Sequence, residues 1–247
     1  MTPIRHDRAC TEVANLKLRE LWQSTISAGN WPVGIPQLWP LQYHTMTSGD
    51  LAFIGLNPSH NAADNSLLAV RGADDLSNPS RCAEVLRRDE TAMGLHGDAI
   101  YRYFRPLEQF DPGRQFNHVD LLALRHMKQN DVLRALRLDK APVQFVLEQM
   151  RICVDLVDAL CPPCVVVVNA RASRILMEFH DGLDLSWDED QGHHWGITPS
   201  GRRPWFFSGM LSSAGQIDAH SRRRLIWHVR RTLTKIRESS VSQCPTR

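Results

Sequence analysis

One short stretch, residues 51–59, constrains the fold of this chain more than any other. It begins with an apolar run, Leu51–Gly55, that has the length of a buried strand, and it ends in a polar turn in which Asn57 precedes Pro58. Such a run is typical of parallel sheets in α/β proteins, where the loops at the carboxyl ends of the strands border a ligand-binding crevice. Gly55 frees the backbone and Pro58 stiffens it, so we expect the Asn57 amide to be held in one direction. Taken alone, these residues also fit an ordinary strand followed by an Asn-Pro turn.

The order of elements along the chain predicts the fold class. Further strands are expected at residues 116–124, 165–168 and 203–207, and an amphipathic helix at 143–160 separates the second strand from the third. Strands that alternate with helices in this way form a parallel sheet with right-handed crossovers. The sequence therefore predicts an α/β fold, a three-layer α/β/α sandwich with a central, mostly parallel sheet of about four strands. Other helices are expected at residues 11–28, 81–92 and 98–109.

The chain of 247 residues, 43% of them hydrophobic, is long enough to bury the core of one medium-sized domain. We expect residues 1–45 to form an N-terminal helix and an extended arm packed on the domain, residues 46–238 to form the α/β domain, and residues 239–247 to form a disordered tail. No apolar run has the length needed to span a bilayer, and the first residues lack the pattern of a signal peptide. The sequence thus indicates a soluble, cytoplasmic protein with no membrane partner, which we expect to be a monomer.

Four successive segments carry polar side chains at or near the expected strand ends. The first is Gly55-Leu56-Asn57-Pro58-Ser59, and the others are Phe116–Leu124, Val165–Ser173 and Trp205–Ser213. In order and spacing they resemble the active-site segments of the uracil-DNA glycosylase superfamily, especially its mismatch-specific and single-strand-selective branches. Those branches have Gly-hydrophobic-Asn-Pro-Gly in the first segment, so Ser59 here replaces the last glycine.

The resemblance implies a role for residues in each segment. Asn57 matches the residue that positions water, either Asn117 or His118 matches the residue that recognises the base, and Ser208 opens the last catalytic loop. An aromatic residue before the second segment, one of Tyr101, Tyr103 and Phe104, stacks on the flipped base. The other substrate-binding residues that the resemblance implies are Gly55, Leu56, Pro58, Ser59, Asp120, Asn169 and Ser212, with Met210 and Leu211 as a wedge that fills the place of the flipped nucleotide.

Several of these residues also fit a structural role. If residues 116–120 form a strand, His118 and Asp120 lie on the same face, where they form a pair near Asn57 or simply a structural hydrogen bond. Met210 and Leu211 fit core packing after a strand equally well. At least two of the three aromatic residues fit a core-facing stripe on a helix.

Hydrolysis of an N-glycosidic bond asks a protein mainly to hold a water and to stabilise the departing base, which an amide and a few hydrogen-bond donors achieve. The sequence therefore predicts a DNA glycosylase-like hydrolase that acts on uracil or another damaged base in single-stranded or duplex DNA. Many active members of the superfamily have His-Pro-Ser in the last loop, where this chain has Ser208-Gly209-Met210. The alternative is a non-catalytic protein of the same fold that binds a nucleobase, a nucleotide or a DNA lesion. A serine hydrolase is disfavoured because no Gly-x-Ser-x-Gly pattern occurs.

Basic residues are concentrated near the end of the chain, although the net charge is only +2. Apolar residues at helical spacing over this stretch predict an amphipathic helix with a basic outer face. Such a face either contacts DNA phosphates or is merely solvated. The residues assigned to DNA contact are Arg222, Arg223 and Arg224.

No residue pattern predicts a metal or an organic cofactor. Cys161 and Cys164 form one close pair, whereas a zinc site or an iron–sulfur cluster needs about four ligands, so we expect the pair to end a helix and open the next strand. His193 and His194 lie near acidic residues, but neighbouring side chains of most backbones point apart, which disfavours a shared metal.

Overall fold

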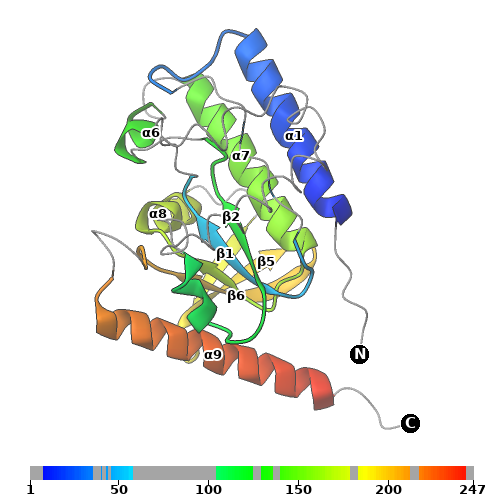
Figure 1. Ribbon diagram of the computed structural model, residues 1–247, viewed down its shortest axis with the longest axis vertical. Coiled ribbons are helices and arrows are strands. Elements are labelled where there is room, and N and C mark those ends of the chain that lie inside the picture. The colour runs from blue at the N-terminus through cyan, green and yellow to red at the C-terminus, as the bar shows by residue number, and fades with distance from the viewer. Residues whose placement is uncertain are drawn as a thin grey trace.

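A computed structural model shows a mixed α/β protein with a mostly parallel sheet (Figure 1). Six strands form this sheet within the described part of the chain, in the order β2-β1-β3-β6-β5-β4. The structure describes residues 8–35, 40, 43, 46–57, 104–124, 129–135, 140–178, 183–211 and 217–242. The strands are β1 (Leu51–Gly55), β2 (Phe116–Asp120), β3 (Val165–Val167), β4 (Asp184–Asp188), β5 (His193–Thr198) and β6 (Gly201–Phe207).

The four strands expected from the sequence are β1, β2, β3 and β6, and they pair in parallel. Every residue of β1 and β3 is buried, because apolar side chains cover both faces of the sheet here. Ala52 and Ile54 face one hydrophobic cluster, whereas Leu51 and Phe53 face another. The alternation along a single strand thus places one cluster on each face of the sheet.

The expected number of four strands is wrong, because β4 and β5 extend the sheet as an antiparallel hairpin. β5 pairs with β6 on one side and with β4 on the other. No strand was expected from the sequence of this region. Most of β4 is in fact exposed, and a strand at the edge of a sheet needs no continuous apolar run.

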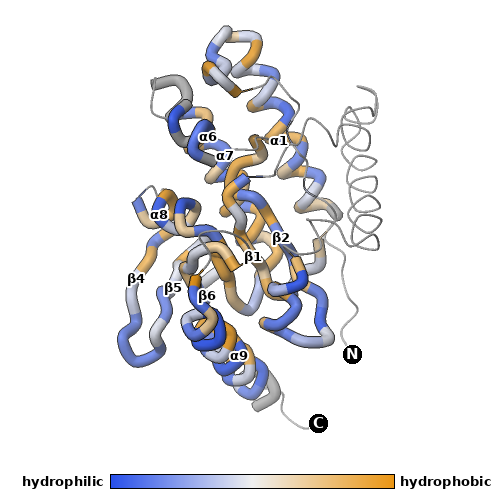
Figure 2. Tube along the Cα trace, turned by 60° about the vertical axis from the view of Figure 1, so that its left-hand side comes forward, coloured by the Kyte–Doolittle hydropathy of each residue, from blue (hydrophilic) through white to orange (hydrophobic). Residues whose placement is uncertain are grey.

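The helices lie against both clusters. The helices are α1 (Arg8–Ser27), α6 (Gln129–Ala135), α7 (Lys140–Ala159), α8 (Ala170–Glu178) and α9 (Ala219–Ser242), with a short 3-10 helix η2 (Leu107–Gln109). α1 and α7 lie side by side (Figure 1), and Trp22 of α1 packs on Phe145 of α7 with ring centroids 4.8 Å apart. On the other face, Val229 and Leu233 of α9 pack with Phe53 and Phe206. Figure 2 shows α9 as a largely hydrophilic helix that lies apart from α1 and α7.

The boundaries expected from the sequence need two changes. α9 continues to Ser242, beyond the tail expected from residue 239. Residues 129–135 form helix α6, which is not among the helices expected from the sequence. The helix expected at 81–92, the first half of the one expected at 98–109, and the aromatic residues Tyr101 and Tyr103 lie outside the described residues. In the second half of the latter, Leu107–Gln109 form the 3-10 helix η2. Among the described helices, none combines the length and the apolar character that crossing a membrane requires.

Candidate functional site

The carboxyl ends of β2, β1, β3 and β6 lie at one edge of the sheet, here called the strand-end edge, because these strands run parallel. The backbone stays paired just beyond the strands, so the polar residues that follow are fixed relative to one another. The hydrogen bonds that join the ends run from the Leu121 N–H to the Gly55 carbonyl (3.1 Å), from Leu122 to Leu56 (2.9 Å), from Val168 to Ile54 (2.9 Å) and from Ser208 to Val167 (2.9 Å).

At this edge His118 and Asp120 lie over Gly55. The two residues alternate along β2 and share a face, and Asp120 pairs with Gly55 across the sheet. A β-carbon on residue 55 would stand 2.5 Å from Asp120 Oδ1 and 3.1 Å from His118 Nε2, so only glycine leaves room for them. The half-buried ring of Phe104 meets the His118 ring edge-on, with centroids 5.1 Å apart. We call Phe104, His118 and Asp120 the polar cluster; it presents an aromatic ring, an imidazole and a carboxylate.

Tyr43 contacts the backbone of the polar cluster. Its hydroxyl donates a 3.0 Å hydrogen bond to the Asp120 backbone carbonyl, at the last residue of β2. Burial, and secondarily the nearby Cys153, raises the pKa of Tyr43 well above its ordinary value, so the hydroxyl stays protonated and remains a donor. This residue was not expected at the site, because a tyrosine in an extended arm gives no local signal of a contact with a distant strand.

Asn57 lies two residues beyond the β1 end. Its Nδ2 donates a 3.2 Å hydrogen bond to the carbonyl of Leu124, in the segment that follows β2. This bond ties the Asn57 amide to the neighbouring strand end and fixes the direction in which its oxygen faces. The expected geometry, an amide held in one orientation at the strand-end edge, therefore has a structural basis that does not depend on Pro58, which lies outside the described residues.

Asn117 does not lie at the strand-end edge. It pairs with Ala52 in the amino-terminal half of β1, and its side chain is 3% exposed. Its Nδ2 donates to the Thr47 carbonyl at 2.8 Å, and its Oδ1 accepts from the Thr47 N–H at 3.0 Å. The Asn117 amide therefore holds the segment that leads into β1. Of the two residues expected to recognise a base, only His118 lies over Gly55.

Asn169 caps helix α8. Its Oδ1 accepts hydrogen bonds from the N–H groups of Arg171 (2.9 Å) and Ala172 (3.2 Å), which have no partner within the first turn. The residue follows β3 at the strand-end edge, as expected, but its side chain is 4% exposed and serves the helix. Its contribution to a site is thus to set the position of α8.

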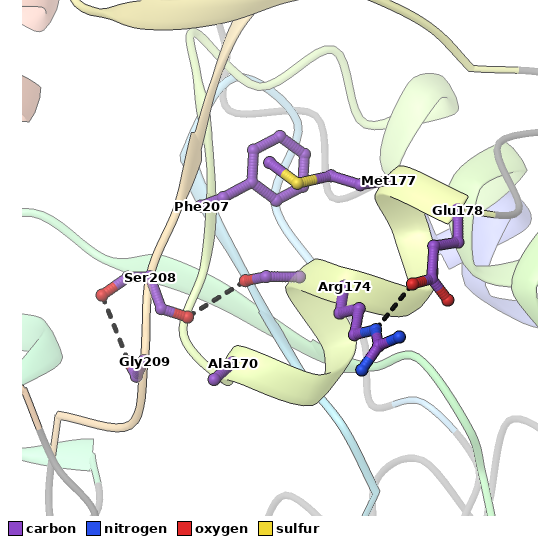
Figure 3. Close-up of a pocket in the computed structure, with 8 residues that line it drawn as sticks. Ala170, Arg174, Met177, Glu178, Phe207, Ser208 and Gly209 are labelled. Atoms are coloured by element: carbon purple, nitrogen blue, oxygen red, sulfur yellow. Dashed lines mark hydrogen bonds and ion pairs between the residues drawn. The ribbon is translucent and has the colours of Figure 1, made fainter.

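Ser208 borders a hollow between the end of β6 and α8 (Figure 3). The hollow has a volume of about 460 Å³. The Ser208 hydroxyl donates to the Gly209 carbonyl at 3.1 Å, and the Ser208 carbonyl accepts from the Ser173 hydroxyl at 3.0 Å. The hollow is lined by Ala170, Ser173, Arg174, Met177, Glu178, Phe207, Ser208 and Gly209. Neither Asn57 nor any residue of the polar cluster lines the hollow, so it is a separate space at the same edge.

The wedge expected in the last loop is only partly supported. Leu211 is 3% exposed and packs in the cluster of hydrophobic residues under α9, so its apolar side chain is used in the core. This corrects its assignment as a substrate-binding wedge. Met210 is half-buried, and its carbonyl accepts a 3.0 Å hydrogen bond from the Ile217 N–H just before α9. Ser59 and Ser212 lie outside the described residues.

The basic residues assigned to DNA contact lie at the start of α9. Arg223 and Arg224 are exposed and Arg222 is half-buried. Asp218 caps the helix, since its Oδ1 accepts from the N–H groups of His220 and Ser221, both at 2.9 Å. Hydrogen bonds from the Ser221 side chain and backbone lower the pKa of Asp218 to about 2, so the cap is charged at neutral pH.

His193 and His194 face opposite sides of the sheet. The ring of His193 packs against Trp195 and Phe206, whereas that of His194 packs against Trp187 and Phe207. Burial lowers the pKa of both imidazoles. Within the described ranges, no three His, Cys, Asp or Glu side chains are grouped to share a metal ion.

Cys161 and Cys164 lie in the connection between α7 and β3, as the sequence suggested. Cys161 is exposed and has a φ of 46°, a left-handed conformation that ends a helix, and its N–H donates to the Asp158 carbonyl at 3.0 Å. Cys164 is fully buried beside β3. The two thiols thus lie in different environments.

Comparison of the sequence with protein-family models and with curated proteins finds no match. A function for this chain therefore has to be inferred from the chemistry of the strand-end edge.

Proposed function

We propose that this protein recognises a nucleobase in DNA at the strand-end edge and hydrolyses its N-glycosidic bond, as a divergent relative of the uracil-DNA glycosylases. The proposal includes their three-layer α/β/α arrangement and a monomeric protein. The observation that carries it is the placement of His118 and Asp120 over Gly55, with Asn57 tied to the adjoining strand end. Side chains that project from a strand are held more rigidly than side chains on a loop, which suits the recognition of a flat polar base.

In this proposal the polar cluster binds the base and Asn57 positions the water. The Asp120 carboxylate accepts a hydrogen bond from an N–H of the base, the His118 imidazole donates or accepts a second one, and Phe104 contributes an apolar ring. The Asn57 Oδ1 accepts a hydrogen bond from the water that attacks the sugar. The sugar gains positive charge as the bond breaks, which the carboxylate of Asp120 also stabilises at a distance.

One feature of the polar cluster favours the second candidate, a protein that binds the base without releasing it. The base departs with negative charge, and a carboxylate beside it raises the energy of that charge. In the last loop the Ser208 hydroxyl donates to the Gly209 carbonyl, so it is not directed at a leaving group. If these effects dominate, Asp120→Asn will increase base release, since the amide keeps the shape of the side chain and removes the charge.

The decisive experiment measures base release from single-stranded and duplex oligonucleotides that carry uracil and a panel of other deaminated or damaged bases. Asn57→Ala is compared with Asn30→Ala, a matched change at an exposed position beyond α1. Release by the wild type and by Asn30→Ala, with a loss of about 100-fold or more in Asn57→Ala, supports the hydrolase. Tighter binding of a modified oligonucleotide than of the same unmodified strand, without release, supports the second candidate. If the protein neither binds nor releases any base of the panel, both candidates are wrong.

A further inference from the structure

The outer face of α9 combines an exposed tryptophan with arginines. Trp227 is 53% exposed, although it is the largest side chain of the helix, and Arg223, Arg224 and Arg231 are exposed around it. Val229 and Leu233 are buried on the opposite side of α9, against the sheet. We call Arg223, Arg224, Trp227 and Arg231 the outer face of α9.

Helical spacing brings these four residues together. Arg223, Trp227 and Arg231 follow one another at intervals of four, and Arg224 lies three residues before Trp227, so all four project from one side. The Arg231 guanidinium lies 5.1 Å from the centre of the Trp227 ring, a cation–π contact. The ring of His228 meets Trp227 edge-on at 4.9 Å. The indole is thus held in place while about half of its surface remains open to solvent.

The arginines of the outer face differ from three other basic residues of α9. Arg230 donates to the Gln109 carbonyl at 2.9 Å, Lys235 donates to Gln191 at 2.8 Å, and Arg237 pairs with Asp111. By contrast, no carboxylate in the described ranges lies within ion-pair distance of Arg223, Arg224 or Arg231. Arg230, Lys235 and Arg237 therefore use their charges to dock on the protein, and the arginines of the outer face remain available to a partner.

A partner of this face needs negative charge at short intervals and flat apolar surfaces between the charges. Single-stranded nucleic acid has both, since its phosphates attract arginine and its unpaired bases stack on aromatic rings. Duplex DNA offers the phosphates, but its bases are stacked inside and do not meet Trp227. We propose that the outer face of α9 binds single-stranded DNA, with Arg223 and Arg224 on phosphates and a base stacked on Trp227.

The position of the helix fits this partner. α9 begins soon after the last loop of the strand-end edge, and the Ile217 N–H donates to the Met210 carbonyl, which ties the start of the helix to that loop. A strand bound along the outer face therefore adjoins the strand-end edge. The inference rests on the proposed function for the choice of DNA as the nucleic acid, but it does not require base release.

The test is the binding of a fluorescein-labelled single-stranded oligonucleotide of mixed sequence without damaged bases, followed by fluorescence anisotropy. Trp227→Ala is expected to weaken binding roughly 5- to 100-fold through loss of stacking, and Trp227→Phe, which keeps a ring, is expected to recover part of it. Trp187→Ala is the matched control. Trp187 is 55% exposed, but it lies on β4 and packs against His194 on the other face of the sheet.

Charge is tested separately. Arg223→Ala combined with Arg224→Ala is expected to weaken binding and to reduce the slope of log K against log salt by about 1.4, or about 0.7 for each phosphate that is no longer neutralised. Lys17→Ala combined with Arg151→Ala removes the same charge from α1 and α7 and is expected to leave the slope unchanged. Thermal unfolding of each variant is measured as a control for retention of the fold.

The inference is overturned if Trp227→Ala binds as tightly as Trp187→Ala, or if the two double variants have the same salt slope. Equal affinity for a duplex of the same length would also contradict it, because a duplex cannot stack on Trp227. Asn57→Ala is expected to bind the undamaged strand as the wild type does. Intact binding with no base release would therefore leave this inference standing while the hydrolase assignment fails.

Discussion

The Asp120 carboxylate lies across Gly55, with Oδ1 only 2.5 Å from the point where a β-carbon on residue 55 would stand. Gly55→Ala is therefore expected to displace Asp120 and His118 from the strand-end edge. Overpacking of this kind lowers the free energy of unfolding by about 1–3 kcal/mol. Urea unfolding measures that loss, and binding of a uracil-containing single strand should fall at the same time because the polar cluster has moved.

A double variant checks this cause. Combining Gly55→Ala with Asp120→Ala removes the carboxylate that meets the new methyl group, so the two changes should not be additive. The double variant is expected to lose less stability than the sum of the two single losses. Simple additivity would show that the methyl group and the carboxylate do not collide.

Asn117 is expected to matter for stability and not for base recognition. Asn117→Asp removes the Nδ2 donor and sets a carboxylate against the Thr47 carbonyl, at a position that is 3% exposed. Loss of a buried hydrogen-bond partner lowers the free energy of unfolding by about 1–3 kcal/mol. Urea unfolding gives this value, with Asn30→Ala as the control. A variant that stays fully stable but no longer binds a base would show that Asn117 takes part in recognition after all.

The end of α7 is fixed to the first half of β6 by a nearly buried ion pair between Asp158 and Arg203. Arg203 Nη2 lies 3.0 Å from Asp158 Oδ1. The Arg203 side chain is 8% exposed and the Asp158 side chain is 13% exposed. The hydroxyl groups of Thr198 and Ser200 also donate to Asp158. Asp158→Asn leaves the buried guanidinium without its counter-charge, so the free energy of unfolding is expected to fall by about 3 kcal/mol.

Asp155 provides the control for that change, since it lies on the same helix and pairs with Lys17 while 53% exposed. Asp155→Asn is expected to cost less than about 1 kcal/mol, because solvent screens an exposed pair. Urea unfolding of both variants measures the difference. Equal losses at the two positions would show that burial of the Asp158 pair has no effect.

The cap of α9 predicts a dependence of stability on acid. The folded-state pKa of Asp218, about 2, is below its ordinary value of 3.8 because Ser221 donates to the carboxylate. Because the folded-state pKa is depressed, the charged Asp218 cap stabilises the folded state fully above about pH 4. This stabilisation is lost as the pH falls from about 4 towards 2. Asp218→Asn should therefore lower Tm by a few degrees at pH 7 and by progressively less at pH 3 and pH 2. Asp190→Asn, in the exposed β4–β5 turn, is the control, and a difference in Tm that stays constant with pH would contradict the prediction.

The strands of the parallel part of the sheet were predictable because their pattern is local. β1 and β3 are buried along their whole length, so a short apolar run between polar turns is sufficient to mark them. The β4–β5 hairpin was missed because its stability comes from pairing with β6, which the sequence of the hairpin does not reveal. Its edge strand, Asp184–Asp188, is mostly exposed and charged at both ends.

The candidate site was predictable as a set of segments and less so as a set of side chains. The alternation along β2 correctly placed His118 and Asp120 on one face. The sequence did not show that Asn117 lies too near the start of β2 to reach the strand-end edge, because that depends on the register with β1. Leu211 was open to two roles for a similar reason. Whether an apolar residue in a loop faces a ligand or a helix depends on where α9 returns to the sheet.

The thiols of Cys153 and Cys164 are expected to be unreactive in the folded protein. Both side chains are fully buried, and burial raises the pKa of each thiol far above its ordinary value, so almost no thiolate exists at neutral pH. Cys161 is exposed at the end of α7 and should react with a disulfide reagent such as DTNB before the other described cysteines. The measurement uses a Cys82→Ser, Cys244→Ser background, so that only cysteines in the described ranges report. Adding Cys161→Ser should remove the fast phase, and urea should expose Cys153 and Cys164 together as the core opens. Fast labelling of either buried thiol without denaturant would mean that α7 and β3 separate readily in the native state.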